Sequence, residues 1–115
     1  MFALSIALAL LVAANAQEPN PIDAAAGRTM ALKFCTPCHV VAPDQEFAPI
    51  FTGPPKPPAF RTIAARRGTS AESLRKFLAT THATATLPIH MANPELTEDQ
   101  TTKIVAFILS LRPHR

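Results

Sequence analysis

The clearest periodic pattern of apolar residues lies near the end of the chain. Residues spaced by three and four positions form one apolar helix face there: Ile104, Phe107, Ile108 and Leu111. Before them, residues 97–100 (Thr-Glu-Asp-Gln) match a capping box, in which side chains satisfy the first free N–H groups of a helix. Pro113 cannot continue a helix. This region is therefore predicted to be an amphipathic helix that begins after Thr97 and ends before Pro113.

Two further segments have the composition of helices. Residues 23–34 are rich in helix formers, and Asp23 is placed to cap them. Residues 69–72 (Thr-Ser-Ala-Glu) fit a second capping box, and the spacing of the apolar residues that follow predicts a middle helix ending near Thr81. No stretch alternates convincingly between apolar and polar residues, so the pattern as a whole predicts an all-helical domain.

Two long loops separate these predicted helices. Residues 40–60 contain half of the 12 prolines, which excludes a regular helix there. A loop of this length in a small domain is commonly either disordered or wrapped around a functional site. The second possibility is favoured by four apolar side chains in the loop: Phe47, Ile50, Phe51 and Phe60. The second loop, residues 82–96, contains Met91.

The first 16 residues are predicted to be a secretory signal peptide. They are almost entirely apolar and end in Ala14-Asn15-Ala16, a small-x-small cleavage pattern. A membrane anchor is the alternative, but a spanning helix needs ~20 apolar residues and no basic stop-transfer cluster follows. Residues 17–115 then form one domain, which we expect in the periplasm and without a stable membrane span.

Composition and charge narrow the functional classes. Without the leader few large apolar residues remain, and the chain has no Trp or Tyr, so the core is thin. Domains this small often need a metal, disulfides or a cofactor. The formal charge of +3 comes from scattered residues rather than from a basic stripe interleaved with aromatics. The sequence therefore favours a cofactor-stabilised domain and does not suggest a nucleic-acid partner.

The candidate chemistry lies in residues 35–39, Cys-Thr-Pro-Cys-His. Cys-x-x-Cys-His is the signature of covalent haem attachment, in which two thiols add to the vinyl groups and the histidine reaches the iron. Cys35 and Cys38 are the predicted anchors, and His39 is the predicted proximal ligand. One haem c would also supply an apolar centre for the thin core.

Three other interpretations of these residues fit less of the chain. A thioredoxin-like dithiol would accompany a βαβ pattern, which is absent. A zinc site would need four ligands, and the remaining histidines form no second pair at the usual spacing. A disulfide between Cys35 and Cys38 would close a loop too short to stabilise much and would leave His39 unexplained.

The second axial ligand of the iron would decide the function. A strong sixth ligand favours electron transfer, whereas an open position favours gas binding or catalysis. Met91 is the natural candidate, because Met30 lies in the first predicted helix and Met1 leaves with the leader. His82 and His90 are chemically sound alternatives that would give a lower potential.

The order of these motifs resembles the class I cytochrome c family, in its short bacterial monohaem type, from Ala24 to Arg112. Gly27 and Ala31 are similar to the small residues that let the family's first helix cross closely over the last. Residues 57–64 are similar to a segment beside the haem. There the resemblance implies that the Pro58 carbonyl, rather than that of Pro54, accepts the ring N–H of the proximal histidine, and that Phe60 lies in the haem pocket.

The resemblance extends to the loop around Met91 and to the last helix. Phe107 stands where the family commonly has tyrosine, and Ala92 stands where it usually has proline. The implied fold is the all-α cytochrome c fold, with three to four helices and long loops enclosing one covalent haem c.

The implied function is electron transfer by Fe(III)/Fe(II) cycling with His39 and Met91 as axial ligands, not catalysis. We expect a monomer that meets redox-protein partners transiently. The alternatives are an electron-entry subunit of a periplasmic oxidoreductase and, if Met91 is not on the iron, a ligand-binding haem sensor.

Overall fold

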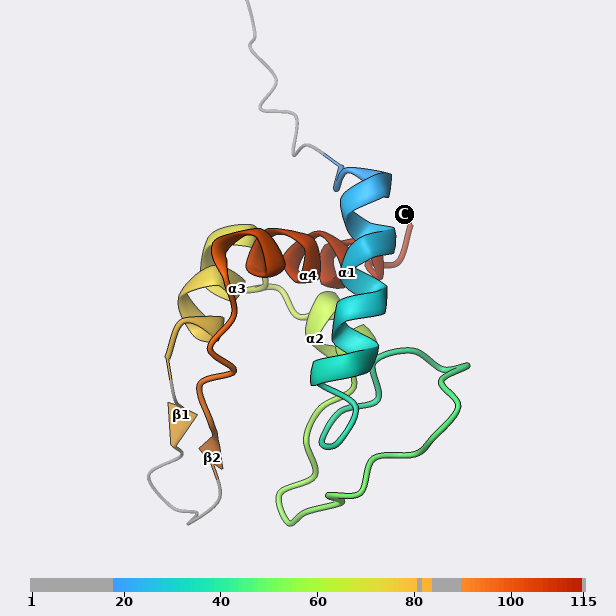
Figure 1. The fold of residues 1–115 in the computed structure, drawn as a ribbon, viewed down its shortest axis with the longest axis vertical. Helices are drawn as coiled ribbons and strands as arrows, with labels where there is room; N and C mark the ends of the chain where they lie inside the picture. Colours follow the sequence, from blue (N-terminus) through green and yellow to red (C-terminus); the bar gives the residue numbers. More distant parts are fainter. Residues whose placement is uncertain (1–17, 81, 84–89, 115) are drawn as a thin grey trace, which may run out of the picture.

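The computed structural model describes residues 18–80, 82–83 and 90–114, so the predicted signal peptide lies outside the described residues. The helices are α1 (Pro21–Phe34), α2 (Phe60–Ala65), α3 (Ala71–Leu78) and α4 (Glu98–Ser110) (Figure 1). A short antiparallel pair, β1 (His82–Ala83) and β2 (His90–Met91), lies in the second loop. The predicted helical fold is therefore present, but α2 and this pair of strands were not individually predicted. None of the helices in the described ranges is long and apolar enough to span a bilayer.

The arrangement of the helices is set by the crossing of α1 over α4 (Figure 1). Gly27 of α1 lies against the α4 backbone, so closely that a Cβ atom built on it would lie 1.8 Å from the Lys103 carbonyl oxygen. Ala24 and Ala31 are buried on the same helix. As the family resemblance implied, small side chains on α1 permit this close crossing.

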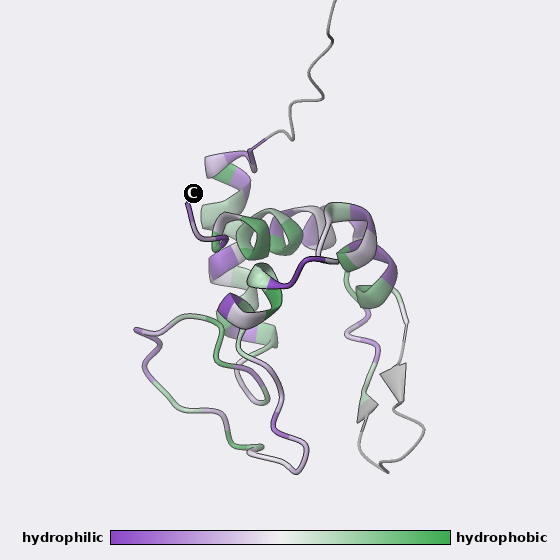
Figure 2. Ribbon diagram, turned by 180° about the vertical axis from the view of Figure 1, so that it is seen from behind, coloured by the Kyte–Doolittle hydropathy of each residue, from purple (hydrophilic) through white to green (hydrophobic). Residues whose placement is uncertain are grey.

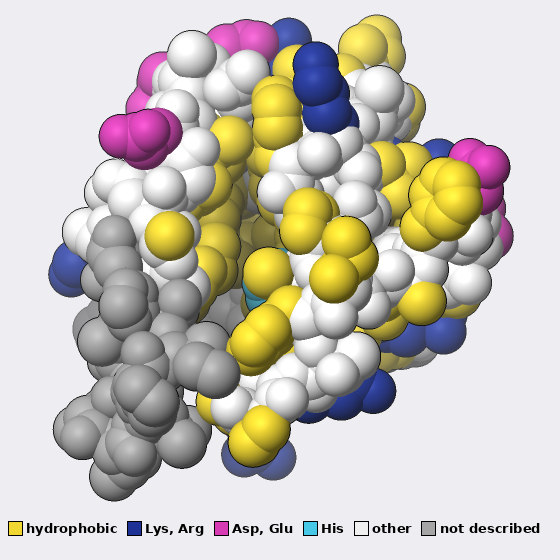
Figure 3. Space-filling model, turned by 60° about the horizontal axis from the view of Figure 1, so that its bottom comes forward, with side chains coloured by type: hydrophobic (Ala, Val, Ile, Leu, Met, Phe, Trp, Pro, Cys, Tyr) yellow, Lys and Arg dark blue, Asp and Glu magenta, His cyan; other side chains and the backbone are white. Residues whose placement is uncertain are grey.

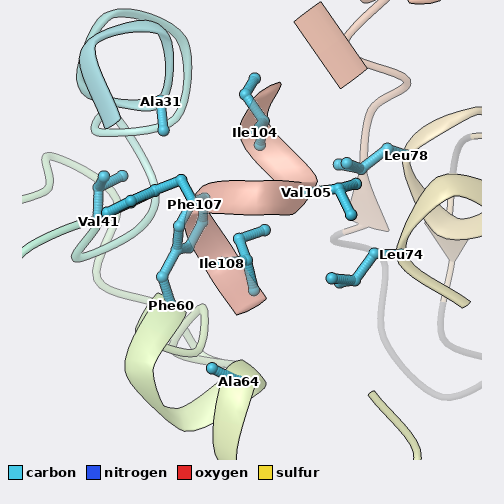
Figure 4. Packing of buried hydrophobic residues seen from close by; sticks show 10 residues of the cluster. All are labelled: Ala31, Val41, Phe60, Ala64, Leu74, Leu78, Ile104, Val105, Phe107 and Ile108. Carbon is cyan, nitrogen blue, oxygen red and sulfur yellow. The ribbon is translucent and has the colours of Figure 1, made fainter. Parts of the chain in front are cut away.

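The core is built around α4. Its buried side chains are Ile104, Val105, Phe107 and Ile108. The other elements contribute buried residues that pack around them: Ala31, Val41, Phe60, Ala64, Leu74 and Leu78 (Figure 4). Ile104 is fully buried, and the predicted apolar face of the last helix is therefore the central surface of the fold.

The start of α1 differs from the prediction. Asn20, not Asp23, caps the helix, because its Oδ1 accepts hydrogen bonds from the N–H groups of Ile22 (2.9 Å) and Asp23 (3.3 Å). Pro21 follows at the first helical position, where its missing donor costs nothing and its fixed φ suits the helix. Asp23 lies in the first turn, where its charge is favourable toward the helix dipole.

The start of α3 is also displaced from its prediction. The capping box joins Ser70 and Ser73 rather than Thr69 and Glu72. The Ser73 N–H donates to the Ser70 hydroxyl at 3.0 Å, and the Ser70 N–H donates to the Ser73 hydroxyl at 2.8 Å. The Thr69 hydroxyl instead donates to the Ile63 carbonyl at 2.6 Å. The helix ends at Leu78, before the predicted Thr81.

The capping box of α4 has the predicted members. The Gln100 N–H donates to the Thr97 hydroxyl at 3.1 Å, and the Thr97 N–H donates to the Gln100 side chain at 3.0 Å. We expect Thr97→Ala to lower the free energy of unfolding by about 1 kcal/mol, the usual cost of losing such a cap. Urea unfolding measures this loss. Thr97→Ser keeps the hydroxyl and should restore most of the stability; an equal loss in both variants would contradict the capping role.

Candidate functional site

The candidate site lies on the side of the helices from which both loops extend. The chain between α1 and α2 and the β1–β2 pair project toward that side (Figure 1). Viewed from there, the surface has a hollow lined with hydrophobic side chains, and a histidine side chain is visible inside it (Figure 3). Such an apolar hollow with an imidazole is suited to a large planar cofactor.

The Cys-x-x-Cys-His segment begins where α1 ends. Cys35 is the C-cap residue, and its N–H donates to the Ala31 carbonyl at 2.8 Å. The N–H groups of Cys38 (3.3 Å) and His39 (2.9 Å) both donate to the Cys35 carbonyl, which folds the segment into a tight turn. Both cysteines are free thiols, with Cys35 partly buried and Cys38 exposed. The turn thus gathers two thiols and one imidazole at one helix end.

His39 is held in a fixed orientation. Its side chain is 8% exposed, and its Nδ1 lies 2.7 Å from the carbonyl oxygen of Pro58. A carbonyl can only accept, so the proton of the neutral imidazole belongs on Nδ1, and Nε2 keeps a lone pair for a metal. The bond assigned to Pro58 rather than Pro54 by the family resemblance is therefore present. It orients the ring and raises its donor strength.

Phe60 connects His39 to the core. Its N–H donates to the Val40 carbonyl at 2.9 Å, and its ring centroid lies 5.5 Å from that of His39. On the other side its ring lies 6.3 Å from Phe107 of α4. Phe60 is buried, and the imidazole is therefore backed by two packed aromatic rings.

The proline-rich loop folds back onto the same segment. The N–H groups of Ile50 (3.1 Å) and Phe51 (3.0 Å) both donate to the Pro37 carbonyl. Phe47 and Ile50 are among the most exposed large apolar side chains, at 72% and 89%. The loop therefore has backbone contacts to the Cys-x-x-Cys-His turn, while much of its apolar surface stays uncovered by protein.

Met91, the candidate second ligand, lies on β2. It is partly buried and packs against the core cluster, and the Cα partner of Met91 in the strand pair is His82. Asn93 fixes the chain after Met91, because its Nδ2 donates to the Ala79 carbonyl at 3.2 Å and its Oδ1 accepts from the Glu95 N–H at 2.9 Å. The pairing does not decide between methionine and histidine ligation, so His82 and His90 stay alternatives.

The protonation of Cys35 follows from its burial. Loss of water contact, with a smaller contribution from the neighbouring Cys38, raises the pKa of the Cys35 thiol to about 11. The unmodified Cys35 is therefore a protonated thiol near neutral pH. Because the thiolate is the reactive form, this burial makes Cys35 a poor redox nucleophile.

These residues fit a covalently bound haem. The two thiols can form thioether bonds, and Nε2 of His39 is the nitrogen left to bind iron. The side from which the loops extend has an apolar hollow in which a histidine is visible (Figure 3). His39 was named as a site residue from its motif, and Pro58 and Phe60 were named through the family resemblance. Two other contacts were not predicted: the bond from Asn93 to the Ala79 carbonyl and the bonds from the proline-rich loop to the Pro37 carbonyl. Both join segments that are distant along the chain and carry no local sequence signal.

Comparison with known proteins agrees with this site. The family model "Cytochrome c" matches residues 24–112, and the chain belongs to the cytochrome c family. It is similar to cytochrome c-552 of Bradyrhizobium diazoefficiens, with 33% identity over 108 residues, which cover 94% of this chain and 93% of that protein. The comparison with solved structures gave no match.

Family membership and the fold together define the protein class. It is a short class I monohaem cytochrome c with the all-α cytochrome c fold. The family implies a covalently bound haem c and haem-mediated electron transfer.

Proposed function

We propose that the protein is an exported electron carrier of the periplasm and not an enzyme. Residues 1–16 are the signal peptide, and residues 17–115 are the haem domain. Cys35 and Cys38 would anchor the haem, and His39 and Met91 would be the residues that bind its iron. The observation that carries this proposal is the hydrogen bond from His39 to the Pro58 carbonyl, which leaves Nε2 available as the proximal ligand.

A carrier benefits from a site that changes little when the electron arrives. Haem, when bound, supplies the one-electron Fe(III)/Fe(II) couple. The chain keeps the proximal ligand in place, because a backbone carbonyl holds the His39 ring and Phe60 packs beside it. Little then has to reorganise around the imidazole during each transfer.

The proposed distal ligand sets the direction in which the potential is tuned. A soft thioether stabilises Fe(II) and raises the potential, whereas a second histidine would lower it. Three observations support Met91: it is partly buried, it packs on the core, and the Asn93 side chain holds the chain that follows it. We expect the holoprotein to act as a monomer that meets its redox partners only transiently.

The proposal is tested by the optical spectrum of the oxidised holoprotein. We expect a long-wavelength methionine-to-iron charge-transfer band, complete loss of this band in Met91→Ala, and a lower reduction potential in that variant. Met30→Leu is the matched control, because Met30 packs against the core from α1 and leucine conserves its volume. This control should keep the band.

Two results would overturn the assignment. If the unmutated protein lacks the band, or Met91→Ala retains it, Met91 is not the ligand and a histidine becomes the candidate. If the reduced protein binds carbon monoxide rapidly near neutral pH, the sixth position is open, and the protein is a ligand-binding haem protein rather than a carrier.

A further inference from the structure

A groove lies on the outer face of α2, away from the ring of Phe60 that contacts His39. It runs between α2 and the end of α4 and has a volume of about 700 Å³. Arg61, Thr62 and Ala65 line it from α2, and residues 110–114 line it from the other side. Phe60 and Ala64 on the opposite face of α2 are buried in the core. The groove therefore has a rigid wall, and its size is within the usual range for ligand sites.

The groove is positively charged, with no acidic residue in its lining. Arg61, Arg112 and His114 all line the groove, and all three are exposed. Arg66 and Arg67 follow directly after α2 in a turn that is strongly hydrophilic (Figure 2). Two of the 11 basic residues of the chain, Arg61 and Arg112, thus line this groove.

These arginines differ from the basic residues that form ion pairs. The ion pairs found in the described ranges involve other side chains: Arg28 with Asp44, Arg75 with Glu98, and Lys103 with Asp99. Within residues 18–80, 82–83 and 90–114, no carboxylate lies within 4.0 Å of Arg61 or Arg112. Arg112 is oriented by a hydrogen bond to the Thr69 carbonyl. The groove therefore presents two guanidinium groups that form no ion pair with the described residues.

The chemistry of the lining indicates what would bind. The guanidinium group offers a planar set of donors that matches carboxylates. Between the charges lie apolar surfaces from Ala65, Leu111 and Pro113. A ligand that carries both carboxylates and an apolar side chain complements both features, and an acidic peptide segment has this composition.

A protein partner fits the groove better than a lipid surface does. The large apolar side chains that are most exposed lie elsewhere in the described chain: Ile22, Phe34, Phe47, Ile50 and Phe77. None of these five residues lines the groove, so among the described residues no highly exposed large apolar side chain is placed there to insert among lipid tails. We propose that this groove docks an acidic segment of a partner protein, with its carboxylates on Arg61 and Arg112 and an apolar side chain against Leu111.

This docking site goes beyond the electron-carrier proposal and does not depend on which residue binds the iron. A partner held there would lie next to α2, whose first residue, Phe60, contacts the proximal histidine. One short helix, α2, would then connect the bound partner to the haem site. Long-range attraction to the groove should weaken as salt screens the charges.

The test uses the full holoprotein, labelled with ¹⁵N, and a synthetic peptide of repeating glutamate and leucine as the probe. We expect chemical-shift changes in α2 and at the end of α4, and affinity about tenfold weaker in Arg61→Gln/Arg112→Gln, since each lost charge pair is a close contact. Lys33→Gln/Lys56→Gln removes the same charge outside the groove and should change affinity less than about twofold. Arg61→Gln alone should give part of the loss, because Arg61 is exposed and its side chain forms no ion pair with the described residues.

Several outcomes would refute the docking site. These are shift changes outside the groove, equal weakening by the lysine control, and binding of anionic phosphatidylglycerol vesicles without binding of the peptide. A peptide in which lysine replaces glutamate should not bind. The charge-transfer band recorded on the same samples reports on Met91 separately, so loss of that band would count against the proposed ligand and not against the groove.

Discussion

Replacing Gly27 by alanine is expected to lower the free energy of unfolding by about 3 kcal/mol, the upper end of the usual cost of overpacking. The added Cβ would lie 1.8 Å from the Lys103 carbonyl oxygen and 2.4 Å from its carbon, which no packed structure tolerates. These are backbone atoms of α4, so no flexible side chain can move aside. Alanine favours helix over glycine by only ~1 kcal/mol, and the clash therefore dominates.

Gly68→Ala is the matched control for this prediction. Gly68 lies before α3, and a Cβ built there meets nothing within 4 Å. The same chemical change should therefore alter stability by less than about 1 kcal/mol. Guanidinium unfolding of both holoproteins, followed by circular dichroism, gives the comparison. Similar stability of the two variants would mean that α1 and α4 do not approach as closely as described.

Phe107→Ala is expected to cost about 4 kcal/mol, because it removes a large side chain from the centre of the core. Phe107 is 5% exposed and its ring lies 6.3 Å from Phe60, which in turn contacts His39. The cavity would lie beside the aromatic ring that backs the imidazole. We therefore expect both a lower unfolding midpoint and a changed haem absorption spectrum.

Phe77→Ala provides the comparison for the core truncation. Phe77 is 41% exposed on α3, so truncation there removes much less buried surface, and we expect a loss of about 1 kcal/mol. Its haem spectrum should match that of the unmutated protein. If Phe107→Ala were no more destabilising than Phe77→Ala, Phe107 would not be the central packing residue that its burial indicates.

The predictability of each helix depended on how much of its signal was local. α4 combined a regular apolar spacing with a capping box at Thr97, and the structure has both. At α3 the predicted cap, Thr69, instead donates to the Ile63 carbonyl, and the next residue, Ser70, forms the capping box with Ser73. α2 has six residues, too few for a periodic pattern, and was not predicted as a separate helix.

The residues of the candidate site likewise divide into those with a local sequence signal and those without one. The Cys-x-x-Cys-His motif is contiguous because the attachment chemistry requires its spacing, and it could be found without any fold. Pro58 lies 19 residues from His39 and was named only through the family resemblance. The bond from Asn93 to Ala79 depends on how the second loop meets α3 and has no sequence signature. The sequence favours Met91 over His82 and His90, whereas the strand pairing does not decide between them.

The acceptor of the His39 proton is a main-chain carbonyl, and this makes the bond unusually resistant to substitution. Every amino acid supplies a carbonyl at position 58, so a change of side chain there leaves the acceptor in place. The 2.7 Å contact is lost only if the loop itself shifts. In related chains the orientation of this imidazole should therefore vary with insertions and deletions between α1 and α2, and hardly at all with the identity of residue 58.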